Sequence, residues 1–323
     1  MKLSVITAFL NEAENLPVFR SRVSEVLGKL DCEAEIILVD DHSTDGGPAY
    51  SRQWATEDPR VTYLRLSKNC GSHYAFSAGL AQTTGDAAVL LAADLQDPPE
   101  AIPALMEKWR EGFAVVWADR SGREGITWLN QLTSKIYYQV MRRIAFKDMP
   151  IQGADFLLLD RKVINVYNLL PERNTSFLAL IHWLGFNQCH IEWTKEKRLF
   201  GHSKWSFRKK AKLFLDSIVA FSYLPIRVLS MAGILFSFLG MAYAVFIVIN
   251  AILGNPNPGW SSLMVVTLLL GGFQLMSTGV LGEYLWRAFD QIRNRPRYIV
   301  EEIRSGGLVK SPDLTDYQTG RND

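Results

Sequence analysis

Acidic side chains follow two apolar runs in the first third of the chain. Asp40 and Asp41 end the run EIILVDD, and Asp94 ends the run DAAVLLAAD. If both runs are parallel strands, their carboxyl ends meet at one edge of a sheet, where open α/β sheets bind their ligands. The pattern therefore indicates a ligand site built around carboxylates.

The apolar runs alternate with helical patterns along residues 1–195. Strands are expected at 3–9, 35–41, 61–66, 86–94, 113–119 and 154–160, with a long helix at 127–146. Such alternation is typical of βαβ units. Strands this apolar are covered on both faces. We therefore expect an α/β fold with a mostly parallel sheet.

The composition excludes several classes of protein. The 323 residues carry 35 Lys+Arg against 33 Asp+Glu, a net charge of +2, and 48% are hydrophobic. Nearly balanced charge argues against a nucleic-acid-binding surface spread over the molecule. Because Cys32, Cys70 and Cys189 share no short spacing, neither a disulfide framework nor a zinc cluster is indicated. A reducing compartment is the simpler interpretation.

Two long stretches without charge, at about 228–253 and 260–282, lie near the C-terminus. A helix rises about 1.5 Å per residue and the bilayer hydrocarbon is about 30 Å thick, so each stretch is long enough to span it. Two buried helices of a soluble core are the alternative, but long soluble helices nearly always show a polar stripe. With the short turn GNPNPGW between them, the stretches predict a transmembrane hairpin at 228–286.

Basic residues flank the hairpin on both sides, which places both flanks and both termini on the cytoplasmic face of the inner membrane. The segment 206–227 begins with a basic cluster and continues with apolar residues at helical spacing, so we expect an amphipathic helix in the membrane interface. A domain-packing helix is the weaker alternative. The polar tail, 287–323, is expected to be loosely ordered after Glu302.

Small residues recur on one face of the second span. Gly271, Leu275, Thr278 and Gly282 fall at helical spacing. Small residues let helices approach closely, so this face is expected to pack within the hairpin or between subunits of a homo-oligomer. The sequence does not separate these two alternatives.

Two common nucleotide-binding motifs are missing from the sequence. No G-x-G-x-x-G follows the first strand and no G-x-x-x-x-G-K-[ST] occurs, which weakens a dehydrogenase or a P-loop enzyme. The chain has instead an ordered series: TAFLNEAENLP (7–17), VDDHSTDGG (39–47), KNCGSHYAFSAGL (68–80), AADLQDPPE (92–100), ADRSGR (118–123), GADF (153–156) and RLFGHSKW (198–205). This series resembles family 2 glycosyltransferases. More narrowly it is similar to polyprenyl-phosphate sugar transferases, such as bactoprenol glucosyltransferases and dolichol-phosphate mannose synthases.

The resemblance covers residues 1 to about 300, hairpin included. It implies a glycosyltransferase A (Rossmann-like) catalytic domain at 1–205, on the cytoplasmic side of the membrane. It also implies inverting transfer of a hexose from a nucleotide diphosphate sugar to polyprenyl (undecaprenyl) phosphate. UDP-glucose is the favoured donor, because the hairpin-bearing bacterial group uses it, and GDP-mannose and UDP-N-acetylglucosamine are the alternatives.

The resemblance assigns the nucleoside pocket to the first two strand ends. Phe9, Asn11 and Glu12 would edge it, and Asp40 and Asp41 would accept hydrogen bonds from a base N–H or ribose hydroxyls. An Asx-turn or a helix cap is the alternative for both aspartates, because capping residues follow at 43–45. We favour ligand binding for Asp41 and a shared role for Asp40.

The run AADLQDPPE corresponds to the family's D-x-D metal motif, with one departure. Ala92 occupies the first acidic position, which leaves Asp94 and Gln96 as candidate ligands of Mg²⁺ or Mn²⁺. A hard cation bound by oxygen neutralises the charge of a departing diphosphate. The missing carboxylate should weaken metal binding in the free enzyme, and it keeps an inactive, membrane-anchored homologue as an alternative.

By the same resemblance, Arg120, Arg123, Ser134 and Tyr137 would bind the phosphate of the lipid acceptor. Guanidinium groups suit this task because they bind a phosphate through two parallel hydrogen bonds. For Arg123 alone a solvated surface arginine is an equal alternative.

The last two motifs would meet the donor and the acceptor. By the resemblance, Arg198 matches the position that meets the donor diphosphate, with Lys204 beside it. Lys195, Lys197 and Arg198 could instead form a plain basic face toward anionic lipid. Asp155 is the candidate catalytic base. Because the acceptor phosphate is already largely ionised at neutral pH, Asp155 would chiefly orient it or stabilise charge at the anomeric carbon. A processive polysaccharide synthase is disfavoured, since no Q-x-x-R-W pentapeptide occurs.

Overall fold

A computed structural model of the chain describes residues 1–120, 156–170, 172, 175–193, 224–253, 259–293, 295–306 and 308–310. The chain divides into two compact units. One comprises Met1–Asp216 with Arg295–Asp323, and the other comprises Ser217–Asn294. Each is described by itself.

The first unit contains a nine-stranded sheet in the order β7-β5-β6-β4-β1-β2-β3-β8-β9. The strands are β1 (Lys2–Phe9), β2 (Glu33–Asp40), β3 (Val61–Leu66), β4 (Ala87–Ala92), β5 (Val115–Arg120), β6 (Leu157–Asp160), β7 (Gln188–Trp193), β8 (Val300–Ser305) and β9 (Leu308–Lys310). Its described helices are α1 (Leu16–Gly28), α2 (Gly47–Glu57), α3 (Ser72–Ala81), α4 (Ile102–Arg110), α6 (Arg161–Leu169) and α7 (Phe177–Trp183). The six strands expected from the sequence are present, and the helix expected at 127–146 lies outside the described residues.

The sheet is mixed rather than mostly parallel. Strands β2, β1 and β4 run parallel with β3, and β5 pairs with β7 in parallel. Strand β6 is antiparallel to both β4 and β5, and β8 is antiparallel to β3. The strands β1 to β5 and β7 therefore end at one edge, called here the carboxyl edge, where β6 and β8 begin.

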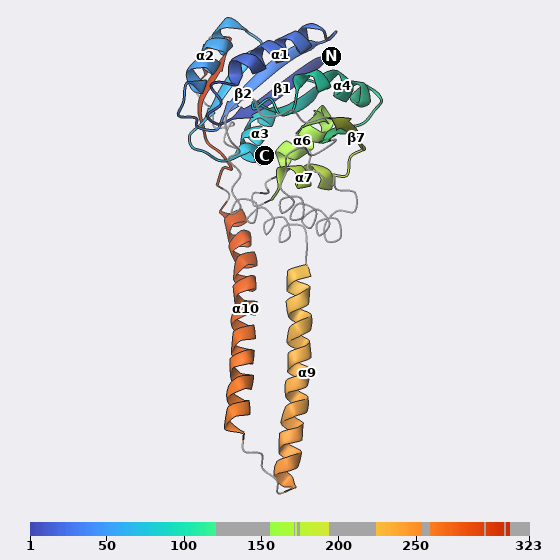
Figure 1. The fold of residues 1–323 in the computed structure, drawn as a ribbon, viewed down its shortest axis with the longest axis vertical. Coiled ribbons are helices and arrows are strands. Elements are labelled where there is room, and N and C mark those ends of the chain that lie inside the picture. Colours follow the sequence, from blue (N-terminus) through green and yellow to red (C-terminus); the bar gives the residue numbers. More distant parts are fainter. Residues whose placement is uncertain are drawn as a thin grey trace. The chain divides into compact units, whose positions relative to one another are not determined.

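Helices cover both faces of the sheet (Figure 1). Side chains of α1, α2 and α4 belong to one apolar cluster with one face of the strands, in which Phe19 and Trp54 meet edge to face at 6.4 Å. On the opposite face α3 packs on β1 and β2, and Tyr167 of α6 meets Phe177 of α7 at 5.1 Å. This two-sided burial explains why the central strands are almost wholly apolar.

Helix α3 lies unusually close to the sheet at Gly79. A Cβ atom at this position would lie 2.3 Å from Ile6 Cγ2 and 3.1 Å from Val39 Cγ2. Because Gly79 has no side chain, α3 can pack this closely against β1 and β2.

The second unit consists of two long apolar helices, α9 (Leu224–Ile252) and α10 (Trp260–Ile292), which lie side by side in Figure 1. The rings of Phe236 and Phe273 meet between them at 5.0 Å. Both helices are long and apolar enough to cross a membrane, and the described residues bury none of either apolar window. Helix α10 continues past the expected end of the hairpin at residue 286, where Glu283 and Arg287 form an ion pair one turn apart.

The chain after α10 returns to the sheet. The expectation of a loosely ordered tail after Glu302 is wrong for residues 303–306 and 308–310, and residues 311–323 lie outside the described residues. Strand β8 pairs with β3, and β9 pairs with β8. Val300 and Ile303 are buried, so this short segment has an apolar face of its own. The sequence analysis underestimated that face because charged residues surround it.

The close approach at Gly79 predicts a stability defect. We expect Gly79→Ala to lower the free energy of unfolding by about 1–3 kcal/mol, because the added methyl group overpacks the contact with Ile6 and Val39. Gly28→Ala, at the end of α1 where an added Cβ meets nothing within 4 Å, is the matched control. We expect it to be neutral or slightly stabilising. Denaturant unfolding of the two variants measures the difference, and equal stabilities would contradict the packing argument.

Glu35 predicts a pH dependence of stability. Burial alone would raise the pKa of this carboxyl, but hydrogen bonds from Lys2, Ser4 and Thr84 lower it from 4.5 to about 2. Because the pKa is lower in the folded state, Glu35 stabilises the fold above about pH 4.5 and loses this effect as the pH falls toward 2. We expect Glu35→Gln to flatten the fall in melting temperature across this window. Unfolding is measured by tryptophan fluorescence. If the melting temperatures of wild type and variant fall in parallel as the pH is lowered, Glu35 is not the group responsible.

Candidate functional site

Three strained residues mark the carboxyl edge of the sheet. In the described part of the chain the non-glycine residues with positive φ are Asn11 (51°), His42 (65°) and Leu95 (58°). They follow β1, β2 and β4, which are neighbours in the sheet. Backbone strain of this kind clusters at functional sites, where the surrounding structure holds it in place. The candidate site is therefore at this edge.

The loops after β1 and β2 are joined by hydrogen bonds between side chains and backbone. Asn11 N–H donates to Ser43 Oγ at 2.9 Å, and Thr44 N–H donates to Asn11 Oδ1 at 2.8 Å. Asp45 accepts from the N–H groups of Ala13 and Gly47, each at 2.9 Å. Together these bonds make the two loops a single rim.

Asp41 lies at this rim with its carboxylate turned toward α3. Its oxygens accept hydrogen bonds from the backbone N–H groups of Cys70 (2.7 Å) and Gly71 (2.8 Å), at the start of that helix. Burial, together with the charge of Asp41, raises the pKa of the Cys70 thiol. Asp41 therefore joins the end of β2 to the backbone just before α3, and a contact between Asp41 and a nucleotide stays a prediction.

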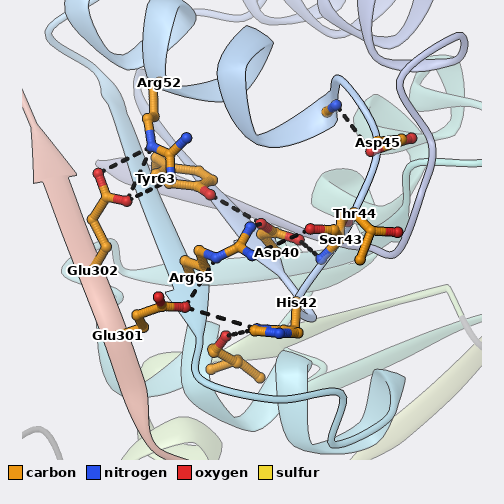
Figure 2. Close-up of polar contacts among 12 residues, drawn as sticks. Asp40, His42, Ser43, Thr44, Asp45, Arg52, Tyr63, Arg65, Glu301 and Glu302 are labelled. Carbon is orange, nitrogen blue, oxygen red and sulfur yellow. Dashed lines mark hydrogen bonds and ion pairs between the residues drawn. The ribbon is translucent and has the colours of Figure 1, made fainter.

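Asp40 is wholly buried and accepts hydrogen bonds from three donors (Figure 2). These are Ser43 N–H at 2.7 Å, Tyr63 Oη at 2.9 Å and Arg65 Nη1 at 2.6 Å. Burial and the adjacent Asp40 charge raise the pKa of the Tyr63 hydroxyl well above its usual range. The pKa of Arg65 is also raised, because its bond with Tyr63 and the Asp40 charge outweigh partial burial. Asp40 thus ties the end of β2 to β3.

Phe9 and Glu12, which were also expected at the nucleoside pocket, differ in exposure. The Phe9 side chain is buried, and its ring atom Cε2 lies 3.3 Å from the Cβ position of Gly47, at the start of α2. Glu12 is partly exposed and accepts a hydrogen bond from Asn15 Nδ2 at 2.6 Å. Phe9 therefore packs beneath the surface, against the start of α2, while Glu12 is one of the partly exposed residues of the rim.

The segment after β4 presents its candidate metal ligands on one side. Ala92, Asp94 and Gln96 are partly exposed and alternate with buried Ala93 and Leu95. Asp94 Oδ1 accepts a hydrogen bond from the Gln96 N–H at 3.2 Å. The described residues hold no group of three His, Cys, Asp or Glu able to bind a metal. One carboxylate and one amide oxygen fit a hard cation that takes its remaining ligands from a bound phosphate.

Most of the expected acceptor and diphosphate residues lie outside the described residues. These are Arg123, Ser134, Tyr137, Asp155, Arg198 and Lys204. Arg120 is the last residue of β5, so its backbone is at the carboxyl edge, and only its backbone is described. The structure therefore places Phe9, Glu12, Asp40, Asp41, Asp94, Gln96 and the backbone of Arg120 along the same edge of the sheet.

The sequence analysis missed Arg65 and its partner Glu301. Arg65 is a charged residue in the otherwise apolar run VTYLRL, two residues after Tyr63 and therefore on the same face of β3. A buried arginine needs a carboxylate nearby, and Asp40 on the adjacent strand was available. Glu301 gave no comparable local signal, since it follows the hairpin.

Comparison with known proteins gives the family. Residues 4–167 match the family model described as Glycosyl transferase family 2. An uncharacterized glycosyltransferase of Synechocystis sp. is 40% identical over 304 residues, which cover 94% of this chain and 96% of that protein. The SfII prophage-derived bactoprenol glucosyl transferase of Shigella flexneri is 36% identical over 307 residues, covering 95% and 99%.

A solved structure has the same fold. Glucosyl-3-phosphoglycerate synthase from Mycobacterium tuberculosis, in complex with Mn²⁺, UDP-glucose and phosphoglyceric acid, aligns with a TM-score of 0.50 and 15% identity. The alignment covers 68% of this chain and 77% of that one. The expected glycosyltransferase A fold is confirmed. The chain belongs to glycosyl transferase family 2 and is a hexosyltransferase.

Proposed function

We propose that this protein transfers a hexose from a nucleotide diphosphate sugar to polyprenyl phosphate, with inversion at the anomeric carbon. The observation that carries the proposal is the match with the Shigella flexneri bactoprenol glucosyl transferase, which covers 99% of that protein. The match therefore includes the two apolar helices, whose apolar windows are not buried by any described residue. A hexosyltransferase with such helices is suited to an acceptor that is itself a membrane lipid.

The donor that we propose is UDP-glucose. The Shigella relative is named a glucosyl transferase, and the aligned Mycobacterium enzyme was solved with UDP-glucose. The rim formed by Asn11, Ser43 and Thr44 offers rigid polar groups beside strained backbone, which suits recognition of a nucleoside. GDP-mannose and UDP-N-acetylglucosamine are the alternative donors.

In the proposed reaction a phosphate oxygen of the acceptor attacks the anomeric carbon in line with the departing nucleotide diphosphate. Arg120, Arg123, Ser134 and Tyr137 bind the acceptor phosphate. Asp155 orients the attacking oxygen, which needs little deprotonation because the second pKa of a phosphomonoester is about 6. Arg198 and Lys204 neutralise the leaving diphosphate.

A divalent cation, Mg²⁺ or Mn²⁺, would be held by Asp94 and Gln96. When bound, it supplies positive charge to the diphosphate oxygens as the bond to the sugar breaks. Because Ala92 offers no ligand, the donor phosphates must complete the coordination, so metal and donor should bind cooperatively. Asp94 also fixes the Gln96 backbone through its hydrogen bond, which holds the two candidate ligands in one loop.

We further propose that α9 and α10 span the inner membrane as a hairpin, with the catalytic unit and both termini in the cytoplasm. The basic residues on both flanks of the hairpin support this orientation. The face with Gly271 and Gly282 is proposed to join copies of the chain, because a Cβ at either glycine would meet nothing within 4 Å among the described residues.

The first test of this function is a panel of donors. We expect purified protein with undecaprenyl phosphate and Mn²⁺ to form sugar–lipid from UDP-glucose and much less from GDP-mannose or UDP-N-acetylglucosamine. The product should carry one sugar and be released from the lipid by mild acid. Failure with all three donors would overturn the proposed function. Binding of a donor by calorimetry without turnover would instead favour the inactive homologue that Ala92 keeps open.

The second test concerns the metal site. We expect Asp94→Ala to lower kcat by about 10²–10³, since one preorganised charge-stabilising group typically contributes this much. Ala92→Asp should lower the Mn²⁺ concentration for half-maximal rate, because it restores a second carboxylate beside Asp94. Asp86→Ala, before the opposite end of β4, is the matched control and should keep wild-type metal dependence. A full, metal-independent rate in Asp94→Ala would exclude this site.

A further inference from the structure

Strand β8 carries two adjacent glutamates that bind arginines on the same face of the sheet. Glu302 accepts three hydrogen bonds from Arg52 of α2, and Glu301 accepts one from Arg65 of β3. Arg52 and Arg65 share a face, because Arg52 lies over the ring of Tyr63, two residues before Arg65. Successive residues of a regular strand point to opposite faces, so this arrangement requires an irregularity.

A β-bulge supplies that irregularity. Arg65 pairs with Glu302 and Leu66 pairs with Val300, which leaves Glu301 as an extra residue on β8. Bulges redirect side chains and are frequent beside active sites. Here the bulge keeps Val300 buried beside Leu66 and frees Glu301 to reach Arg65. The orientation of the Glu301 side chain is therefore set by the bulge in a paired strand.

Arg65 joins Glu301 to the rim of the site. Its Nε donates to Glu301 at 3.0 Å, its Nη1 to Asp40 at 2.6 Å and its Nη2 to the carbonyl of Ser43 at 3.2 Å. Ser43 in turn accepts the hydrogen bond from Asn11. A guanidinium with three fixed acceptors keeps one orientation, so Glu301 takes part in fixing both loops of the rim.

His42 lies beside the same glutamate (Figure 2). Its Nδ1 is 3.1 Å from the Leu66 carbonyl oxygen and 3.7 Å from Glu301 Oε2. A carbonyl oxygen only accepts, so the contact with Leu66 is a hydrogen bond in the tautomer that carries the proton on Nδ1. The imidazole is more than a third exposed, on a residue with positive φ at the carboxyl edge.

We propose that Glu301 is a positioning residue for donor binding: it holds His42 and Arg65 at the end of β2, where they shape the site for the nucleoside diphosphate of the donor. The strand that follows the membrane hairpin thus completes the donor site without contacting the sugar nucleotide. This inference rests on the proposed function, since it takes a nucleotide diphosphate sugar as the ligand of the carboxyl edge.

Glu302 is the matched control for Glu301. It lies on the same strand, binds Arg52 at 2.8 Å and also contacts Arg304. Although its backbone pairs with that of Arg65 in the sheet, its side-chain carboxylate bonds only to Arg52 and Arg304 in the described part of the chain, and not to Arg65, Asp40 or His42. Replacing it therefore disturbs the docking of β8 and not the rim.

The experiment compares Glu301→Gln and Glu302→Gln in the full chain, purified in detergent. Donor affinity is measured by calorimetry with UDP-glucose, GDP-mannose and UDP-N-acetylglucosamine in Mn²⁺, and turnover is measured with undecaprenyl phosphate. For Glu301→Gln we expect the Kd and KM of the donor to rise about threefold to tenfold, the effect of losing one partly exposed, charge-assisted interaction. Its kcat and its KM for the acceptor should stay within about twofold. Glu302→Gln should lower the melting temperature at least as much as Glu301→Gln does, while its Kd for the donor stays within about twofold of the wild-type value.

The outcomes separate this inference from the function on which it rests. No binding of any of the three donors by the wild-type chain overturns the proposed function and this inference with it. Wild-type affinity in Glu301→Gln, or an equal loss of affinity in both variants that follows their melting temperatures, overturns the inference alone. If Glu301→Gln does not fold, Glu301→Asp, which keeps the charge on a shorter side chain, takes its place with the same expected split between KM and kcat.

Discussion

The buried carboxylate of Asp40 constrains the whole carboxyl edge. Its side chain has no exposure to water, so its charge must be compensated within the protein. Tyr63, Arg65 and the Ser43 backbone provide that compensation from the next strand and the next loop. The end of β2 therefore cannot move independently of β3. The strained backbone at His42 is held in place in the same way, because breaking the hydrogen bonds of Asp40 would leave a buried charge uncompensated.

The sequence predicted the strands but not the completed sheet. Runs such as VTYLRL and DAAVLLAAD are local signals, because a strand covered on both faces must be apolar along its own length. The antiparallel pairing of β8 with β3 joins residues that are 236 positions apart, as Arg65 and Glu301 show. No local pattern encodes such a pairing. The mixed order of the sheet and the ordered segment after Glu302 were therefore missed.

The candidate site shows a different limit of sequence analysis. The motif VDDHSTDGG suits a ligand-binding loop and a set of caps equally well, because both uses require carboxylate and hydroxyl oxygens at a strand end. In the structure Asp41 accepts from two backbone N–H groups at the start of α3. Membership of the family could be predicted from the order of the motifs. The different contacts of Asp40 and Asp41 could not, because they depend on the positions of Arg65 and of the backbone before α3.

The position of the hairpin in the sequence has a consequence for how the catalytic unit forms. Helices α9 and α10 lie between β7 and β8 along the chain, yet β8 and β9 belong to the sheet of the first unit. That sheet can therefore be completed only after both apolar helices have been made. The part of the chain that the structure describes does not bury their apolar windows, and apolar surface of this extent typically marks a site of membrane or protein interaction. The ion pair between Glu301 and Arg65 can therefore form only after both helices have been synthesised.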